Sequence, residues 1–267
     1  MSLKKNISFT DVCACIHQHS LFFLVLARDL NHVFTKIQEL DKMGFPYIIV
    51  CGQRHDHPNI VFREPLGKYD AINYGFNLIP NNIEFVVLND VDTQILNFAE
   101  ALKILDNHVG LVYAKVIISE GPQKMFSKLY ESIRTKFMIG PSGELMLIRR
   151  QILESILPLK PCKAEDAYIM FKVIETGYKV VYSDKCLALT ERTKTNYDEI
   201  NYKRRTTCGI YQALSMTNPP IITLIFYALL PFSCLMLLVL GKVGFSFVKG
   251  IWLGLIDYMR GDLGGKF

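Results

Sequence analysis

Two aspartates near the middle of the chain have the type and spacing to bind a cation. Asp90 and Asp92 follow the apolar run Phe85–Leu88, which is typical of a buried strand. In open α/β sheets, ligands bind beyond the carboxyl ends of the parallel strands. On the turn after this strand the two carboxylates can converge on one divalent ion, since such ions prefer oxygen ligands. The alternative is an Asx turn that caps the next helix.

Two further pairs of residues lie where helices are predicted to begin. Gly67 and Lys68 place backbone N–H groups and an ammonium where an anion could bind. The other residues of a Walker loop are missing, and an ordinary helix start with an exposed lysine is the alternative. Glu165 and Asp166 precede an amphipathic helix that Gly177 ends. The helix dipole favours acidic residues in a first turn, so capping and catalysis both remain open.

Other polar groups have simpler explanations. Arg149 and Arg150 end a predicted strand and could bind an anion or form a solvated helix start. Cysteines and histidines alternate within residues 13–19, a spacing that favours a strand over a zinc site.

The elements that must position these residues alternate between strand and helix. Strands are predicted over 21–26, 47–51, 60–62, 85–88, 110–118, 145–150 and 178–182, and helices over 32–43, 67–80, 98–105 and 165–177. Residues 120–140 are expected to form a loop or helix over a cleft. This order predicts an α/β fold with a mostly parallel sheet flanked by helices.

Composition limits the partners. The 267 residues include 30 basic and 25 acidic side chains, for a net charge of +5. This excess is too weak to predict nucleic acid as a partner, and it suits a surface facing anionic lipid. Seven cysteines without framework spacing indicate a reducing compartment.

The C-terminal part changes character sharply. No charged residue occurs from Thr206 to Gly241, and Ile221–Leu240 has the ~20 residues that a bilayer-spanning helix needs. Residues 243–258 are predicted to be a second span or an interfacial helix. A buried core helix is the alternative for Ile221–Leu240.

These features predict two parts. Residues 1–212 would form a catalytic domain and residues 213–267 a membrane anchor. The basic cluster Lys203–Arg205, just before the apolar segment, predicts that the domain lies on the cytoplasmic side of the cell membrane.

The order of the motifs over residues 20–215 resembles the processive and lipid-linked branch of family 2 glycosyltransferases. That branch includes cellulose-synthase-like, hyaluronan-synthase-like and ceramide-glucosyltransferase-like enzymes. The resemblance implies a GT-A fold with a Rossmann-like sheet, a UDP- or GDP-sugar donor, an inverting displacement and a divalent metal, Mn²⁺ or Mg²⁺.

By position, the resemblance assigns roles to individual residues. Asp90 and Asp92 match the metal ligands, and Asp90 also binds the donor. Asp166 matches the general base, with Glu165 beside it.

More residues are carried over near the donor and acceptor. Lys68 and Asn73 match donor-binding residues, and Arg205 matches the arginine that contacts the leaving diphosphate. Gly143 and Arg204 are candidates for acceptor binding or for support of the site. Gly209 and Gln212 also fit the pattern that follows that arginine.

The sequence departs from the family at two places, which bear on nucleobase recognition and on polymer synthesis. The strand 47–51 is followed by Gly52 and Gln53 where an aspartate that reads the nucleobase is expected, so Gln53 or Asp56 would substitute. Tyr202 and Thr206 replace the glutamine and tryptophan of the arginine motif, and the tryptophan lines the acceptor site of polymer-forming members.

The sequence therefore predicts a membrane-anchored glycosyltransferase that transfers one sugar, or a few, to a lipid-linked or carbohydrate acceptor. The alternative is a catalytically silent nucleotide-sugar-binding subunit of a membrane polysaccharide synthase complex.

Overall fold

A computed structural model describes residues 20–124 and 143–261. The cysteines and histidines within 13–19 and most of the segment 120–140 lie outside these ranges.

The core is an eight-stranded mixed sheet with strand order β3-β2-β1-β4-β7-β6-β8-β5. Its strands are β1 (Leu21–Ala27), β2 (Tyr47–Cys51), β3 (Ile60–Phe62), β4 (Phe85–Asp90), β5 (Gln94–Leu96), β6 (Val109–Ile118), β7 (Leu145–Arg149) and β8 (Lys179–Thr190). The first four strands pair in parallel, and β7 runs antiparallel between β4 and β6. The edge at Asp90 therefore holds the carboxyl ends of the parallel strands and the start of β7.

The central strands are apolar throughout because both faces of the sheet are covered. In β1, Phe22 and Leu24 belong to the apolar cluster on one face, and Phe23 and Val25 to the cluster on the other. All four side chains are buried.

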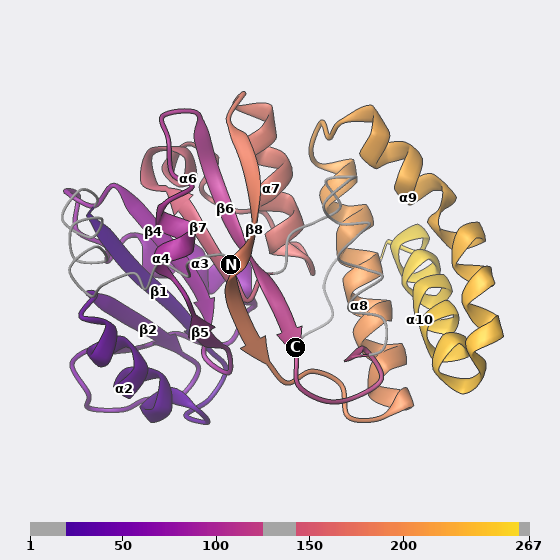
Figure 1. The fold of residues 1–267 in the computed structure, drawn as a ribbon, viewed down its shortest axis with the longest axis horizontal. Helices are drawn as coiled ribbons and strands as arrows, with labels where there is room; N and C mark the ends of the chain where they lie inside the picture. Colours follow the sequence, from indigo (N-terminus) through magenta and orange to yellow (C-terminus); the bar gives the residue numbers. More distant parts are fainter. Residues whose placement is uncertain (1–19, 125–142, 262–267) are drawn as a thin grey trace, which may run out of the picture.

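Helices form layers on both faces (Figure 1). They are α2 (Val33–Met43), α3 (Lys68–Phe76), α4 (Ala99–Leu102), α6 (Arg150–Ile156) and α7 (Glu165–Glu175). Residues of α3, α6 and α7 share one apolar cluster with the sheet, and residues of α2 and α4 share the other. The α/β architecture expected from the sequence is confirmed.

One long helix was not predicted. The polar stretch after β8 forms α8 (Asn196–Ser215), which begins with a capping box between Thr195 and Asp198. Its many charged residues hide the apolar periodicity that normally reveals a helix. Smaller differences are that β8 extends to Thr190, and that Arg150 begins α6 rather than ending a strand.

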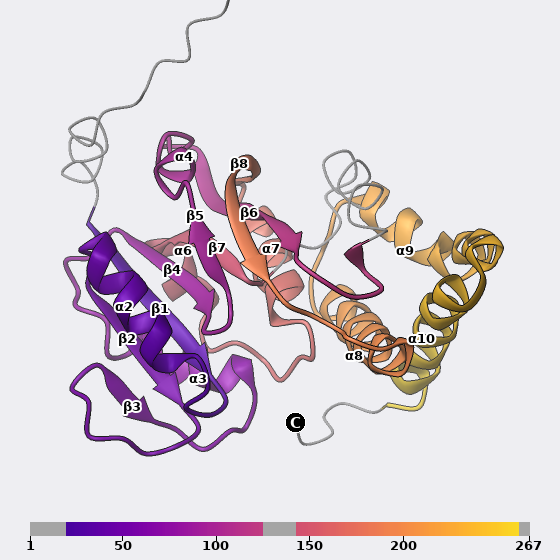
Figure 2. The same cartoon turned by 60° about the horizontal axis from the view of Figure 1, so that its bottom comes forward.

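The C-terminal residues form α9 (Ile221–Ser233), the 3₁₀ helix η1 (Cys234–Leu240) and α10 (Gly241–Met259). Together with α8 they group at the end of the molecule opposite β3 and α2 (Figures 1 and 2). The continuous helical stretch Ile221–Met259 is the one segment of the described residues long and apolar enough to cross a membrane. The chain turns at Gly241, whose φ of 64° lies in the region that favours glycine.

Candidate active site

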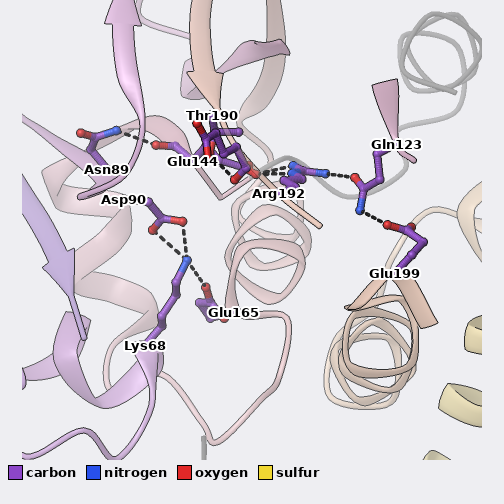
Figure 3. Close-up of polar contacts among 10 residues, drawn as sticks. Lys68, Asn89, Asp90, Gln123, Glu144, Glu165, Thr190, Arg192 and Glu199 are labelled. Carbon is purple, nitrogen blue, oxygen red and sulfur yellow. Dashed lines mark hydrogen bonds and ion pairs between the residues drawn. The ribbon is translucent and has the colours of Figure 1, made fainter. Parts of the chain in front are cut away.

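Four elements of the chain meet at the carboxyl edge of the sheet. Asp90 ends β4, and its backbone N–H donates to the carbonyl of Glu144, just before β7. The Asn89 side chain donates to the same carbonyl at 2.6 Å. The first residues of α3 and α7 bring Lys68 and Glu165 to this edge (Figure 3).

Lys68 lies between the carboxylates of Asp90 and Glu165. Its Nζ lies 2.7 and 2.6 Å from Oδ1 and Oδ2 of Asp90, and 3.8 Å from Oε1 of Glu165. Burial by itself would lower the pKa of Lys68, but the Asp90 and Glu165 carboxylates raise it above its ordinary value. Lys68 therefore stays protonated, and about a third of its side chain remains accessible to solvent.

The two acidic residues that begin α7 differ in their surroundings. Burial raises the pKa of Glu165 to about 7; Lys68 opposes the rise and Asp166 adds to it. Asp166 is only half-buried, and its Oδ1 accepts from the Ala167 N–H at 2.8 Å. A side chain at Gly143 would place a Cβ 3.3 Å from Asp166 Oδ2, so this glycine keeps the space beside the predicted base open.

The metal prediction fits these residues only in part. Asp92 lies on the exposed turn after β4, while Asp90 is engaged by Lys68. Within residues 20–124 and 143–261, no group of three His, Cys, Asp or Glu residues could hold a metal. Two carboxylates suffice for a Mg²⁺-type ion when substrate phosphates complete its shell. Asp90 and Asp92 therefore fit a cation that binds together with a diphosphate.

The helix α8 adds two residues on the other side of the site. The Arg205 guanidinium is exposed and lies 5.8 Å from the centre of the Tyr202 ring. Burial raises the pKa of Tyr202 to about 12, and the negative charges of Glu144 and Asp166 contribute to the rise. Tyr202 therefore lies near the predicted leaving-group arginine and within the electrostatic influence of the predicted base.

A buried polar chain joins the site to α8, and the sequence did not reveal it. Arg192 donates to Glu144 through Nε, at 2.9 Å, and through Nη2, and it donates to Gln123 at 3.0 Å. Gln123 in turn donates to Glu199 of α8 at 2.9 Å, and the Thr193 hydroxyl donates to the same carboxylate. We call these five residues the bridging network; Figure 3 labels all of them except Thr193. A lone arginine in a polar stretch gives no signal of such pairing.

The residues that follow the arginine motif hold α8 against the segment before α7. A Cβ on Gly209 would lie 2.4 Å from the backbone nitrogen of Ala164, so only glycine permits this approach. The Gln212 side chain accepts from the Lys163 N–H at 3.0 Å. These contacts hold α8 against Ala164, which precedes Asp166 by two positions in the chain.

Two predicted residues make structural contacts instead of facing the carboxylates. The Asn73 amide exchanges two hydrogen bonds with the backbone of Leu159. Arg204 forms a two-point ion pair with Asp257 of α10, with Nη2 2.8 Å from Oδ1. The donor and acceptor roles of Asn73 and Arg204 stay predictions.

The arginine pair at the end of β7 lies at the opposite edge of the sheet. Arg149 pairs with Glu84, and Arg150 donates to the Pro80 carbonyl at 2.7 Å. Arg150 begins a helix, as one interpretation expected, but its side chain is buried rather than solvated. Gln53 follows the end of β2, and its Oε1 accepts from the Leu30 N–H, in the turn after β1.

Comparisons with solved structures identify proteins that share this fold. No protein-family model matches the sequence, and no curated protein matches it. A mannosyltransferase from Pyrobaculum calidifontis, solved with GDP-Man and Mn²⁺, has a TM-score of 0.70 at 15% identity, over 90% of this chain and 87% of that chain. Glucosyl-3-phosphoglycerate synthase from Mycobacterium tuberculosis, solved with Mn²⁺, UDP and phosphoglyceric acid, has a TM-score of 0.55 at 11% identity, over 82% and 85% of the two chains.

The chain therefore has the GT-A fold of nucleotide-sugar-dependent glycosyltransferases. Membership of family 2, and of the branch within it, stays a prediction.

Proposed function

We propose that this protein is a metal-dependent glycosyltransferase that moves a sugar, with inversion, from a nucleotide sugar to a lipid-linked or polysaccharide acceptor. The observation that carries the proposal is the meeting of Lys68, Asp90, Glu165 and Asp166 at the carboxyl edge of a GT-A sheet. The structural relatives were solved with GDP-Man or UDP, which supports a UDP- or GDP-sugar as donor.

Asp166 acts as the general base in this reaction. The acceptor hydroxyl gives its proton to Asp166 while its oxygen bonds to the anomeric carbon, and the bond from that carbon to the diphosphate breaks. A positioned carboxylate contributes a factor of about 10²–10⁴ to such a step. Gly143 leaves room beside Asp166 for the acceptor oxygen.

Cationic side chains stabilise the negative charge that grows on the diphosphate. Arg205 is exposed and free to approach it, and Lys68 is partly accessible. Mn²⁺ or Mg²⁺, held by Asp90, Asp92 and the diphosphate, would supply further charge stabilisation as a Lewis acid. A diphosphate that attracts Lys68 would also free Asp90 for this ion.

The apolar C-terminal helices support attachment to a membrane, with the catalytic domain on the cytoplasmic side as the Lys203–Arg205 cluster predicts. A lipid-linked acceptor is consistent with that position. Subunits of a synthase complex are further candidate partners.

Release of nucleoside diphosphate tests the proposal. The detergent-purified protein is incubated with UDP- and GDP-sugars, with Mn²⁺ or Mg²⁺ or with chelator, and with lipid and oligosaccharide acceptors. We expect metal-dependent release from one donor that falls at least about 100-fold in Asp92→Asn and Asp166→Asn. The exposed Asp184→Asn is the matched control and should keep its activity.

A different result would favour the other candidate. Donor binding without release for every donor and acceptor would identify a silent subunit. Equal activity of Asp166→Asn and the parent protein would remove Asp166 from the mechanism.

A further inference from the structure

The outer surface of the C-terminal helices is unusually apolar. Most of the exposed large apolar side chains of the described residues lie between Ile221 and Phe245. Among them Phe232 is 64%, Met236 77% and Val239 87% exposed. We call this surface, formed by α9, η1 and the outer side of α10, the apolar face. A contiguous surface of this kind marks a site of interaction with another molecule or a membrane.

The helix α10 is bound along α8 over most of its length, with the two helices parallel. A Cβ on Gly250 would lie 2.8 Å from the Ile200 carbonyl oxygen, and one on Gly254 would lie 2.5 Å from that of Arg204. The Arg204–Asp257 ion pair joins the same two helices, and the Tyr211 and Tyr258 rings stack 5.6 Å apart. The two helices therefore keep one fixed arrangement.

The helix α9 is also tied to α8. Its Tyr227 is buried, and the Tyr211 hydroxyl donates to the Tyr227 carbonyl at 2.7 Å. At the other end, the Gly244 backbone approaches η1 so closely that a Cβ would meet the Leu237 carbonyl. The three C-terminal elements thus form one body with α8.

This packing opposes a membrane-spanning arrangement. If α10 crossed a bilayer, the adjacent residues Lys203, Arg204 and Arg205 of α8 would be carried toward the hydrocarbon. Charged side chains at that depth are strongly unfavourable. A position parallel to the bilayer surface keeps α8 in water and places only the apolar face in lipid.

The outer side of α10 has the composition of an interfacial helix. Lys242, Phe245, Lys249 and Trp252 recur at helical spacing, and both lysines are exposed. Lysines attract anionic headgroups, and aromatic rings are favoured at the boundary between headgroups and acyl chains. The positive charge of Lys242 and Lys249 is therefore complementary to an anionic lipid surface, whereas a second copy of the same face would repel it.

We propose that α9, η1 and α10 lie in the plane of one leaflet of an anionic bilayer, rather than crossing it. The apolar face enters the boundary between headgroups and acyl chains, while Lys242 and Lys249 meet anionic headgroups. The proposal refines the membrane attachment that is part of the proposed function, and its test does not depend on turnover.

The single tryptophan of the chain reports the depth directly. Trp252 lies beside Phe232, with ring centres 6.1 Å apart. Eleven residues separate it from the turn at Gly241, a helical rise of about 16 Å. In a spanning hairpin Trp252 would therefore lie near the middle of a core about 30 Å thick.

The 267-residue chain is added to phosphatidylcholine vesicles with and without phosphatidylglycerol, each with a quencher attached near the headgroup or deep in the acyl chain. We expect stronger quenching of Trp252 by the shallow quencher, and tighter binding to the anionic vesicles. Stronger quenching by the deep quencher would overturn the in-plane arrangement.

Substitutions test which residues bind the lipid. Phe232→Gln with Met236→Gln should weaken vesicle binding at least tenfold, because two large apolar side chains no longer enter lipid. Lys242→Gln and Lys249→Gln should each weaken binding to anionic vesicles roughly fivefold. The control Phe34→Gln removes an exposed phenylalanine from α2 and should bind as the parent does.

Two further readouts keep the result interpretable. Circular dichroism checks that each variant is folded, and nucleoside-diphosphate release is measured separately. A protein that releases nucleoside diphosphate but does not bind vesicles, and that forms a dimer shielding Trp252, would overturn this inference and leave the proposed function intact. A protein that binds vesicles as expected but releases no nucleoside diphosphate would support the in-plane arrangement and contradict the proposed function.

Discussion

Two polar clusters flank the candidate site, and they are built differently. The donor-side cluster of Lys68, Asp90 and Glu165 has one cation shared between two carboxylates and open to solvent. In the bridging network, Arg192 and Glu144 are largely buried and bonded through several atoms. The accessible Lys68 ammonium can leave its carboxylates and bind an incoming anion, whereas the buried Arg192–Glu144 pair cannot change partners in this way. The first cluster is therefore suited to ligand exchange and the second to holding α8 in place.

The largest effect on stability is expected in the bridging network. Arg192→Ala removes the guanidinium that pairs with the buried Glu144 carboxylate, which should lower the free energy of unfolding by about 3–5 kcal/mol. Arg192→Lys should recover only part of this loss, because an ammonium cannot replace the planar fork of the guanidinium. Urea denaturation measures both.

Lys194→Ala is the matched control, since Lys194 lies in the same loop and is 72% exposed. It should change stability by less than about 0.5 kcal/mol. Equal stability of Arg192→Ala and Lys194→Ala would show that the network does not hold α8.

The next largest effect is pH-dependent and belongs to Glu165. Its folded-state pKa of about 7 exceeds the ordinary 4.5, so the folded protein binds more protons and loses stability as pH rises between these values. Glu165→Gln should therefore have a higher free energy of unfolding than the parent at pH 8, by at most about 3 kcal/mol, and a correspondingly higher unfolding temperature, with no gain at pH 4.5.

Thermal unfolding across pH 4.5–8 checks this, with the exposed Glu154→Gln as control. A gain of the same size at both ends of the pH range would contradict a raised pKa at Glu165.

A smaller effect should appear in metal binding. Lys68→Gln removes the cation from Asp90, so Mn²⁺ should bind about tenfold more tightly when no nucleotide is present. Electron paramagnetic resonance of free Mn²⁺ measures the affinity. The exposed Lys103→Gln should not change it, and an unchanged affinity in Lys68→Gln would show that Lys68 and the metal do not compete.

The smallest effect on stability is expected at Arg205. Its guanidinium is exposed, so Arg205→Ala should change the free energy of unfolding by less than about 0.5 kcal/mol. Its kcat/KM should nevertheless fall by about 10²-fold, because a cation near the leaving diphosphate is lost. Denaturation and diphosphate release together check this, and a loss of stability without a loss of turnover would assign Arg205 to packing.

The difference between the clusters also explains what could be predicted from sequence. Lys68, Asp90 and Glu165 sit at the ends of strands or helices, and the parallel topology brings such ends to one edge. The bridging network joins Glu144 to Arg192 and Gln123 to Glu199, pairs separated by 48 and 76 positions, so no local pattern reveals them. Hydropathy identified the C-terminal apolar segment, but the packing of α10 on α8 depends on glycine contacts that hydropathy does not measure.

The length of α8 bears on which acceptors can react. Its 20 residues extend about 30 Å, and the same helix carries Arg205 at the site and the contacts with α10. With α10 at a lipid surface, the transfer site stands at a set height above the headgroups. An acceptor held in that membrane would then be selected by the distance of its hydroxyl from the membrane surface. A hydroxyl closer to the surface than Asp166, or farther from it, would not meet Asp166, whatever the chemical identity of the acceptor.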